Sequence, residues 1–367
     1  MKKYLFLASV AALSFTACTN ETEEFTGTGS ASQQQQIAVF PVNQNVTKAA
    51  VQGTTFPTTN TMEVKAYQTQ PSATGYFDKT TYTYQFLGGA SDPTNNPNYW
   101  GGNPARYWPL SPAKLNFFAV SGAGVTASHI TIADALASAN VAYTSTNTYS
   151  ATTQSDIMYA FNRAAVTKTG NTLTFPEKVD MEFHHALALI NFQIKAKDNP
   201  SKAIQIYKIE LNGARYTGSL AITNTNAATE SDVWSATVDW TPDAVVNNVK
   251  VPSIGDETTP VALTTDFVPV NSATSYPASL MIIPSTQTPT VTQYGFTTFK
   301  IFYKFDGKDY NIEYAPAGWT GETPNVTNVE VGKKYTYQIT MQLHEILVNP
   351  TVDDWDDATG SPSDVQL

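Results

Sequence analysis

Short runs in which apolar and polar residues alternate constrain this chain more than any other feature. The clearest are Thr61–Tyr67, Thr80–Phe86 and Lys114–Val120, which are rich in Thr, Val, Phe and Tyr. Further strand-like runs lie at residues 188–195, 204–211, 296–305 and 334–348. A two-residue period places successive side chains on opposite faces of a strand, so each alternating run predicts a half-buried β-strand.

Turn-forming clusters such as Gly88–Pro93 and Asp306–Asp309 separate these runs. Helical periodicity is confined to Thr131–Ala139, where Ile132 and Leu136 would share one face. Many short strands between tight turns are typical of β-sandwiches. Because 367 residues exceed what one hydrophobic core usually organises, the sequence predicts an all-β protein of two sandwich domains with few short helices.

The domain boundary is expected in the polar stretch Arg163–Thr172. The strands before it would form an N-terminal sandwich over residues 49–170. A new series of strands begins at Leu173 and would form a C-terminal sandwich over residues 171–367.

Charge and cysteine content exclude several functional classes. The net charge is −10 and only 14% of residues are charged, against about 25% in an average globular domain. An acidic chain without basic clusters would be repelled by a phosphate backbone, so we expect no nucleic-acid partner. The single cysteine rules out an intramolecular disulfide and a cysteine-cluster zinc site.

The N-terminus has the layout of a secretory signal. Two lysines precede the apolar run Tyr4–Phe15, and the small residues Thr16 and Ala17 lead to Cys18. The run is too short to span a bilayer, which takes about 20 apolar residues, and no later segment approaches that length. We therefore expect a signal peptide over residues 1–17 and no transmembrane helix after it.

Cys18 resembles the lipidated cysteine of a bacterial lipobox, with Phe15 where leucine is usual. Acyl chains on Cys18 would anchor the protein to a membrane. The alternative is an ordinary signal peptide with an incidental cysteine. Residues 18–36 are expected to form an acidic, low-complexity tether. Its Glu21, Glu23 and Glu24 resemble the surface-export signal of Bacteroidales lipoproteins. The alternative is that these three glutamates only keep the tether solvated.

Several motifs, taken in order, resemble those of fimbrillin-like proteins from Bacteroidales, the type V pilins. They are Ala105–Leu110 (ARYWPL) with Leu115–Ala119, Asp156–Ala160 (DIMYA), Phe183–Ala188 (FHHALA), Gly332–Tyr337 (GKKYTY) and Val352–Trp355 (VDDW). Each motif alone is weak. Together they span about residues 37–355 and follow a lipobox, which makes the resemblance specific.

The resemblance implies two tandem transthyretin-like β-sandwiches in a lipoprotein that is exported to the cell surface as an outer-membrane precursor. It also implies that a trypsin-like protease removes the first strand, here residues 37–48, by cutting between Lys48 and Ala49. Lys48 is the only basic residue between Gln36 and Ala49, and it replaces the arginine usual in the family. An arginine-specific protease would fail here, and the alternative is that Lys48 is never cut.

Removal of a strand would expose backbone donors and acceptors beside an apolar groove. A strand from another subunit could fill that groove, and repeated head-to-tail contacts of this kind give an open filament. The partners implied are other fimbrial subunits, with a fimbrium as the final location. The adhesion ligand is unknown.

The tail departs from the pattern of a stalk subunit. Pro362 and its polar neighbours make the last residues a poor donor strand, because a donor needs alternating apolar residues. Ile346–Val348 is the better apolar run, and we expect it to belong to the last strand of its own domain. The sequence therefore favours a tip or accessory subunit, or one that donates this last strand.

The sequence gives little support for catalysis or for metal binding. His184 and His185 are adjacent, so on a strand they face opposite ways and cannot chelate one metal ion; core or interface histidines are expected. No catalytic or nucleotide-binding fingerprint occurs, so we expect neither an enzyme nor a cofactor or metal. A calcium ion at the acidic residues 353–357 is the alternative to a solvated end. Glycoside hydrolysis by a pair of these carboxylates has the least support.

Aromatic residues in a loop rich in Gly, Asn and Pro suggest one further contact. Tyr99 and Trp100 could stack on a sugar ring or lie in a partner interface, whereas Trp108 is expected to pack onto the sandwich. A monomeric, surface-exposed, glycan-binding lipoprotein is therefore the alternative to a fimbrial subunit. Cleavage at Lys48 would distinguish the two functions.

Overall fold

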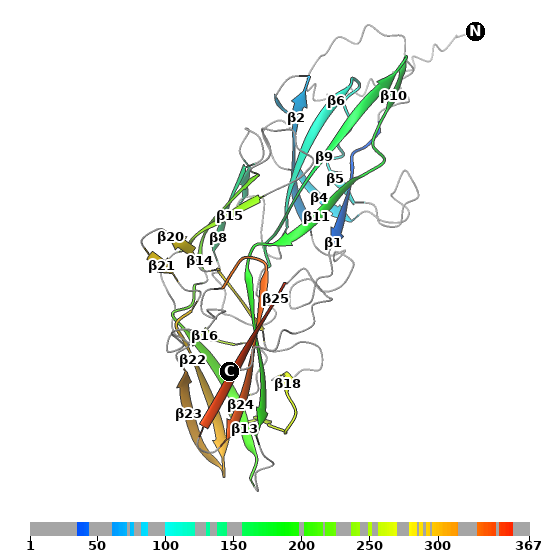
Figure 1. Ribbon diagram of the computed structural model, residues 1–367. Coiled ribbons are helices and arrows are strands. Elements are labelled where there is room, and N and C mark those ends of the chain that lie inside the picture. The colour runs from blue at the N-terminus through cyan, green and yellow to red at the C-terminus, as the bar shows by residue number, and fades with distance from the viewer. Residues whose placement is uncertain are drawn as a thin grey trace, which may run out of the picture. The chain divides into compact units, whose positions relative to one another are not determined.

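Every regular element that the computed structural model describes is a β-strand (Figure 1). The described residues are 35–43, 61–71, 74–76, 82–86, 100–121, 130–132, 138–144, 156–197, 202–215, 217–224, 236–242, 249–251, 256–269, 279–284, 286–288, 291–293, 296–314, 329–342 and 345–354. No helix long and apolar enough to span a bilayer occurs among them. The predicted all-β fold class is confirmed.

The first sheet has nine strands and closes on itself. Its members are β1 (Ala38–Asn43), β2 (Thr61–Gln70), β3 (Thr74–Gly75), β4 (Tyr82–Phe86), β5 (Trp100–Asn103), β6 (Ala113–Ser121), β9 (Met158–Thr169), β10 (Thr172–Thr174) and β11 (Val179–His185). Pairing runs from β9 through β11, β1, β5, β4, β2 and β6 and returns to β9. Strands β3 and β10 pair beside this ring.

Alternation places one set of side chains inside the ring. On β6, Leu115, Phe117 and Ala119 belong to a buried cluster, and Met62, Val64 and Ala66 of β2 contribute to it in the same way. The apolar side chains of the predicted strands therefore form the core, as their two-residue period requires.

Two five-stranded sheets lie further along the chain. One contains β12 (Ala188–Ala196), β18 (Val268–Pro269), β19 (Ser279–Ile282), β24 (Lys333–Gln342) and β25 (Glu345–Asp354). The other contains β13 (Ile204–Asn212), β16 (Val249–Lys250), β17 (Val261–Ala262), β22 (Thr298–Phe305) and β23 (Lys308–Tyr314). Both supply one core cluster, in which Phe192 of β12 stacks on Tyr337 of β24 and meets Phe299 of β22 edge-on, as in a β-sandwich.

A four-stranded sheet joins distant parts of the chain. It consists of β7 (Ile130–Ile132), β8 (Ser138–Thr144), β14 (Thr217–Asn224) and β15 (Ala236–Pro242), with β8 paired to β14. A small hairpin of β20 (Thr286–Thr288) and β21 (Val291–Gln293) completes the described elements. On β15, the Trp240 indole Nε1 donates a 2.7 Å hydrogen bond to the carbonyl oxygen of Ala186.

Two expectations about single elements were wrong. The helix expected over Thr131–Ala139 is absent where the structure describes this stretch, because Thr131 and Ile132 end β7 and Ser138 and Ala139 begin β8. The run 334–348 is part of two strands, β24 and β25, which pair from Gln342 opposite Glu345 onward. In both places pairing with another strand decides the structure, which a local periodicity does not report.

The division into domains stays a prediction, as does the tandem transthyretin-like arrangement. Residues 163–169 and 172–174 of the expected boundary form β9 and β10, which pair as a hairpin with Gly170 at φ 61°. Strand β11, which follows residue 170, belongs to the ring. The β8–β14 ladder also pairs strands from the two sides of that boundary.

Candidate functional site

Strand β1 lies between β11 and β5 and completes the ring (Figure 1). It runs parallel to β11, with Val39 opposite Val179. On its other side it runs antiparallel to β5, with Val39 opposite Trp100. The first described strand of the chain is thus a central strand with a neighbour on each side.

The residues before β1 extend this pairing. The N–H of Ile37 donates to the carbonyl oxygen of Arg106 at 2.8 Å, and the N–H of Trp108 donates to that of Gln35 at 3.0 Å. The Gln35 side chain donates from Nε2 to the carbonyl oxygen of Pro176 at 3.1 Å. We call the surroundings of residues 35–43 the β1 slot; they are Trp100–Gly101, Arg106–Trp108 and Pro176–Phe183.

The β1 slot holds its strand by apolar contact as well as by backbone pairing. Ile37 and Val39 are 1% and 0% exposed, and both belong to the core cluster of the ring. Trp100 and Trp108 belong to the same cluster, and Trp108 packs edge-on against Phe117 with ring centroids 5.7 Å apart. Full burial of a Val or Ile side chain contributes about 1.5–3 kcal/mol, so these two residues bind the strand strongly. Trp108 therefore packs inward, as predicted.

The chemistry of the β1 slot suits strand binding. Without β1, strands β5 and β11 would each present an unpaired edge, and the apolar groove between them would include Trp100 and Trp108. One extended segment could pair with both edges at once. Within the described ranges, no three His, Cys, Asp or Glu side chains gather as metal ligands.

Of the residues expected to carry the lipid, the cleavage site and the sugar or interface contact, the structure describes Trp100. Outside the described residues lie Cys18, Lys48, Ala49 and Tyr99. Trp100 lies in β5, is 3% exposed and packs edge-on against Phe86 at a centroid distance of 5.7 Å. Trp100 is thus buried with β1 in place, and both contacts expected there, with a sugar or with a partner, stay predictions.

The two adjacent histidines face opposite ways on β11, as predicted. His185 is buried, and its Nδ1 lies 3.0 Å from Oδ1 and 2.9 Å from Oδ2 of Asp156. The His184 side chain is 41% exposed, and its ring lies 5.8 Å from that of Tyr159. The expectation of a core histidine with a hydrogen-bond partner is confirmed for His185.

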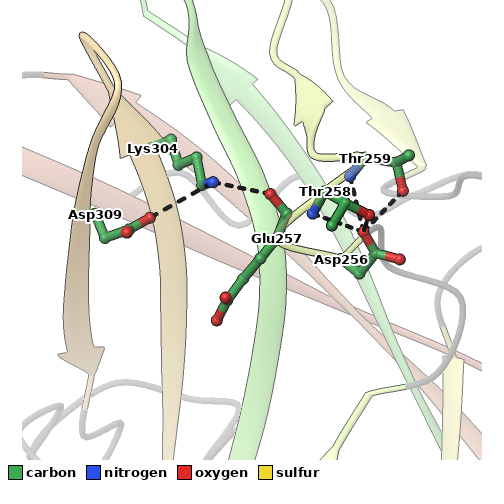
Figure 2. Close-up of polar contacts among 6 residues, drawn as sticks. All are labelled: Asp256, Glu257, Thr258, Thr259, Lys304 and Asp309. Carbon is green, nitrogen blue, oxygen red and sulfur yellow. Dashed lines mark hydrogen bonds and ion pairs between the residues drawn. The ribbon is translucent and has the colours of Figure 1, made fainter.

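In a surface turn before β17, a carboxylate is occupied by hydrogen bonds within the turn. Figure 2 shows the Asp256 carboxylate accepting hydrogen bonds from both the hydroxyl and the backbone N–H of Thr258 and of Thr259. These bonds, that of the Thr258 hydroxyl first, hold the pKa of Asp256 below its ordinary range. Lys304 Nζ donates to the carbonyl oxygen of Glu257 at 2.8 Å and ties the turn to β22. This carboxylate serves the turn itself.

The acidic cluster at residues 353–357 is described only in part. Asp353 and Asp354 end β25, and the later residues of the cluster lie outside the described ranges. The calcium alternative therefore stays a prediction.

Sequence reasoning missed the β11 wall of the slot. Val179, Met181 and Phe183 are buried and alternate with the half-buried Asp180 and Glu182. This alternation could have predicted a strand there. Its parallel pairing with β1 has no local signal, because the two strands are far apart in sequence.

A family model described as fimbrillin-like matches residues 47–355. The five motifs singled out in the sequence lie within this range. No curated protein matches the chain.

Solved structures from Bacteroidales are similar to this chain at low sequence identity. A fimbrial protein from Bacteroides vulgatus ATCC 8482 is 16% identical, with 87% of this chain and 99% of that chain covered and a TM-score of 0.44. The tip fimbrial protein Mfa3 from Porphyromonas gingivalis, with a C-terminal truncation, is 12% identical, with 87% and 98% covered and a TM-score of 0.43.

Proposed function

This chain belongs to the fimbrillin-like family, and we propose that it is a structural and adhesive subunit of a fimbrium, a type V pilus. In this proposal the precursor is exported through its signal peptide and anchored to the outer membrane at Cys18. A trypsin-like protease then cuts between Lys48 and Ala49. The subunit joins other fimbrial subunits at the cell surface by strand addition, and it works by assembly and not by catalysis.

The position of β1 carries this proposal. A strand that ends at Asn43, before the expected cut at Lys48, fills a place between two other strands of a closed ring. Its loss would open two edges and an apolar groove at once, which is the site that strand addition requires. The family match begins at residue 47, so β1 lies outside the segment matched to the family model.

The donor side of the proposal concerns β25. The Ile346–Val348 run is part of β25, the last strand among the described residues, and pairs with β24, with Val348 opposite Ile339. To act as a donor, β25 would have to give up this ladder. We therefore favour a tip or accessory subunit that accepts a strand, with donation by β25 as the second possibility.

Proteolysis of the purified full-length precursor tests the proposal. A trypsin-like protease should give a discrete cut after Lys48, identified by mass spectrometry, and the cut chain should then capture a synthetic peptide with the sequence of residues 35–48. Ladders that resist SDS, formed by the cut chain alone, would assign it to the stalk, whereas peptide capture without ladders would assign it to a tip.

Two variants provide the controls. Lys48→Gln should stay uncut at this position and capture nothing, and Lys48→Arg should be cut by an arginine-specific protease that leaves the natural chain intact. An uncut natural chain that binds a soluble glycan would refute the proposal and favour a monomeric glycan-binding lipoprotein.

A further inference from the structure

We propose that β1 is replaced in one direction, starting at Asn43 and finishing at Gln35. This inference rests on the proposed function, because it concerns how the β1 slot exchanges its strand. It follows from an unequal hold on the two ends of the segment, which we call the clamped end (residues 35–39) and the open end (residues 40–43).

The clamped end is held on both sides and from the core. Backbone hydrogen bonds join it to Arg106 and Trp108 on one side, and the Gln35 side chain bonds to Pro176 on the other. Val39 has a strand partner on each side. Residues 37–39 are all buried, so release of this end would expose apolar surface and break hydrogen bonds together.

The open end is held less firmly. Phe40 and Pro41 are only half-buried, and proline has no N–H to donate to a ladder. The Phe40 ring contacts Lys178, whose Nζ lies 5.3 Å from the ring centroid. Pairing with β11 continues through Asn43. Phe40 and Pro41 are thus less buried than residues 37–39, and the less buried end of a segment opens at the lower free energy, so this end separates first.

Cleavage would act on the open end. Lys48 follows Asn43 by five residues, so a cut after Lys48 gives the open end a free terminus. Once residues 40–43 separate, the Asp180–Phe183 edge of β11 becomes available to an incoming strand. That strand would then displace the old one step by step towards the clamped end, without both edges ever being bare along their whole length.

This route divides the incoming strand into two parts with different roles. Residues that take the places of 40–43 set the rate at which exchange begins. Residues that take the places of Ile37 and Val39 arrive last and set the final affinity. The donor chemistry we infer is an extended segment parallel to β11, with apolar side chains two positions apart at its clamped end.

Hydrogen exchange of the intact precursor tests the unequal hold without any cleavage. The amides of residues 40, 42 and 43 should exchange about fivefold or more faster than those of residues 37–39, a factor of the size that one hydrogen bond contributes. Equal protection of the two ends, or stronger protection of residues 40–43, would overturn the inference.

Displacement kinetics test the direction. The full-length precursor, cut at Lys48 and carrying a fluorescent label on the segment that includes β1, is mixed with synthetic peptides of residues 35–39, 39–48 or 35–48. Peptide 39–48 should speed release of the labelled segment by about fivefold or more, whereas peptide 35–39 should not. The complete peptide should match the rate of 39–48 and remain bound longest.

The outcomes separate this inference from the proposed function. Faster release with peptide 35–39 than with 39–48, or equal rates with both, would refute the direction and leave strand addition standing. Failure of the complete peptide to displace the segment would refute strand addition itself.

Discussion

Replacement of Val39 by alanine should weaken the hold of the ring on β1 more than any change of similar size elsewhere. Val39 is fully buried and has a strand partner on both sides. Val39→Ala removes two buried carbon atoms, each of which contributes about 0.8 kcal/mol to the free energy of unfolding. The cavity left behind raises the total loss to about 2–3 kcal/mol.

The matched control is Val251→Ala. Val251 is also fully buried, but it belongs to the core cluster of the two five-stranded sheets and not to that of the ring. In the intact precursor both substitutions should lower the free energy of unfolding by a similar amount, measured in urea. As long as the chain is uncut at Lys48, β1 is covalently joined to the rest of the protein, so the weaker binding of β1 in Val39→Ala does not release it.

After cleavage at Lys48 the two variants should separate. The cut segment is then a bound peptide, so a loss of about 2–3 kcal/mol weakens its binding by about 30- to 150-fold in Val39→Ala. Val251→Ala should retain the peptide as the natural chain does. Fluorescence anisotropy of a labelled segment measures both. Equal retention by the two variants would show that β1 is not held by its apolar side chains, and the reasoning would fail.

Three further tests concern parts of the fold outside the β1 slot. His185→Ala should lower the free energy of unfolding in urea by about 3 kcal/mol, because it leaves the buried Asp156 side chain without its partner. His184→Ala removes a side chain that is 41% exposed and should change this free energy by less than about 0.5 kcal/mol. Similar costs for the two variants would contradict the pairing. Gly213 has φ 66°, and a Cβ there would lie 2.5 Å from the Thr297 hydroxyl, so Gly213→Ala should lower the free energy of unfolding by about 3 kcal/mol. Gly170 has a similar φ of 61° but open space around it, so Gly170→Ala should cost about 1 kcal/mol. Burial raises the pKa of Tyr335 from 10.0 to about 12, so the unfolded chain loses this proton first and the free energy of unfolding should fall as the pH rises from about 10 to 12. Tyr335→Phe should make this fall less steep when unfolding in urea is measured across that pH range. An unchanged dependence of the free energy on pH would refute the raised pKa of Tyr335.

Local pattern was enough to predict the strands that line the cores. The alternating run Lys114–Val120 became β6, and Thr61–Tyr67 became most of β2, because their apolar residues fit a pleated surface with one buried face. The adjacency of His184 and His185 predicted their opposite environments for the same reason. These predictions need no knowledge of which strands are neighbours.

Pairing partners could not be predicted from local pattern. Thr131 and Ile132 lie in a segment with one turn of helical periodicity, yet they belong to β7, which pairs with β8. The family resemblance implied a strand from residue 37, but its place between β5 and β11 depends on residues far along the chain. The strand itself and the inward packing of Trp108 were therefore predictable, and the pairing of β1 with its two neighbours was not.

The closed ring gives a physical reason for assembly by single strands. A strand lost from the edge of an open sheet exposes one new edge, and the sheet can end there. A strand lost from a closed ring exposes two edges that face one groove, and both are satisfied only when one segment pairs with each. On our proposal each β1 slot therefore takes up one donor, and a subunit with one slot and one donor extends a chain in a single direction. If the last strand to be described, β25, stays paired with β24, the subunit accepts a strand without donating this one, and on our proposal it ends such a chain.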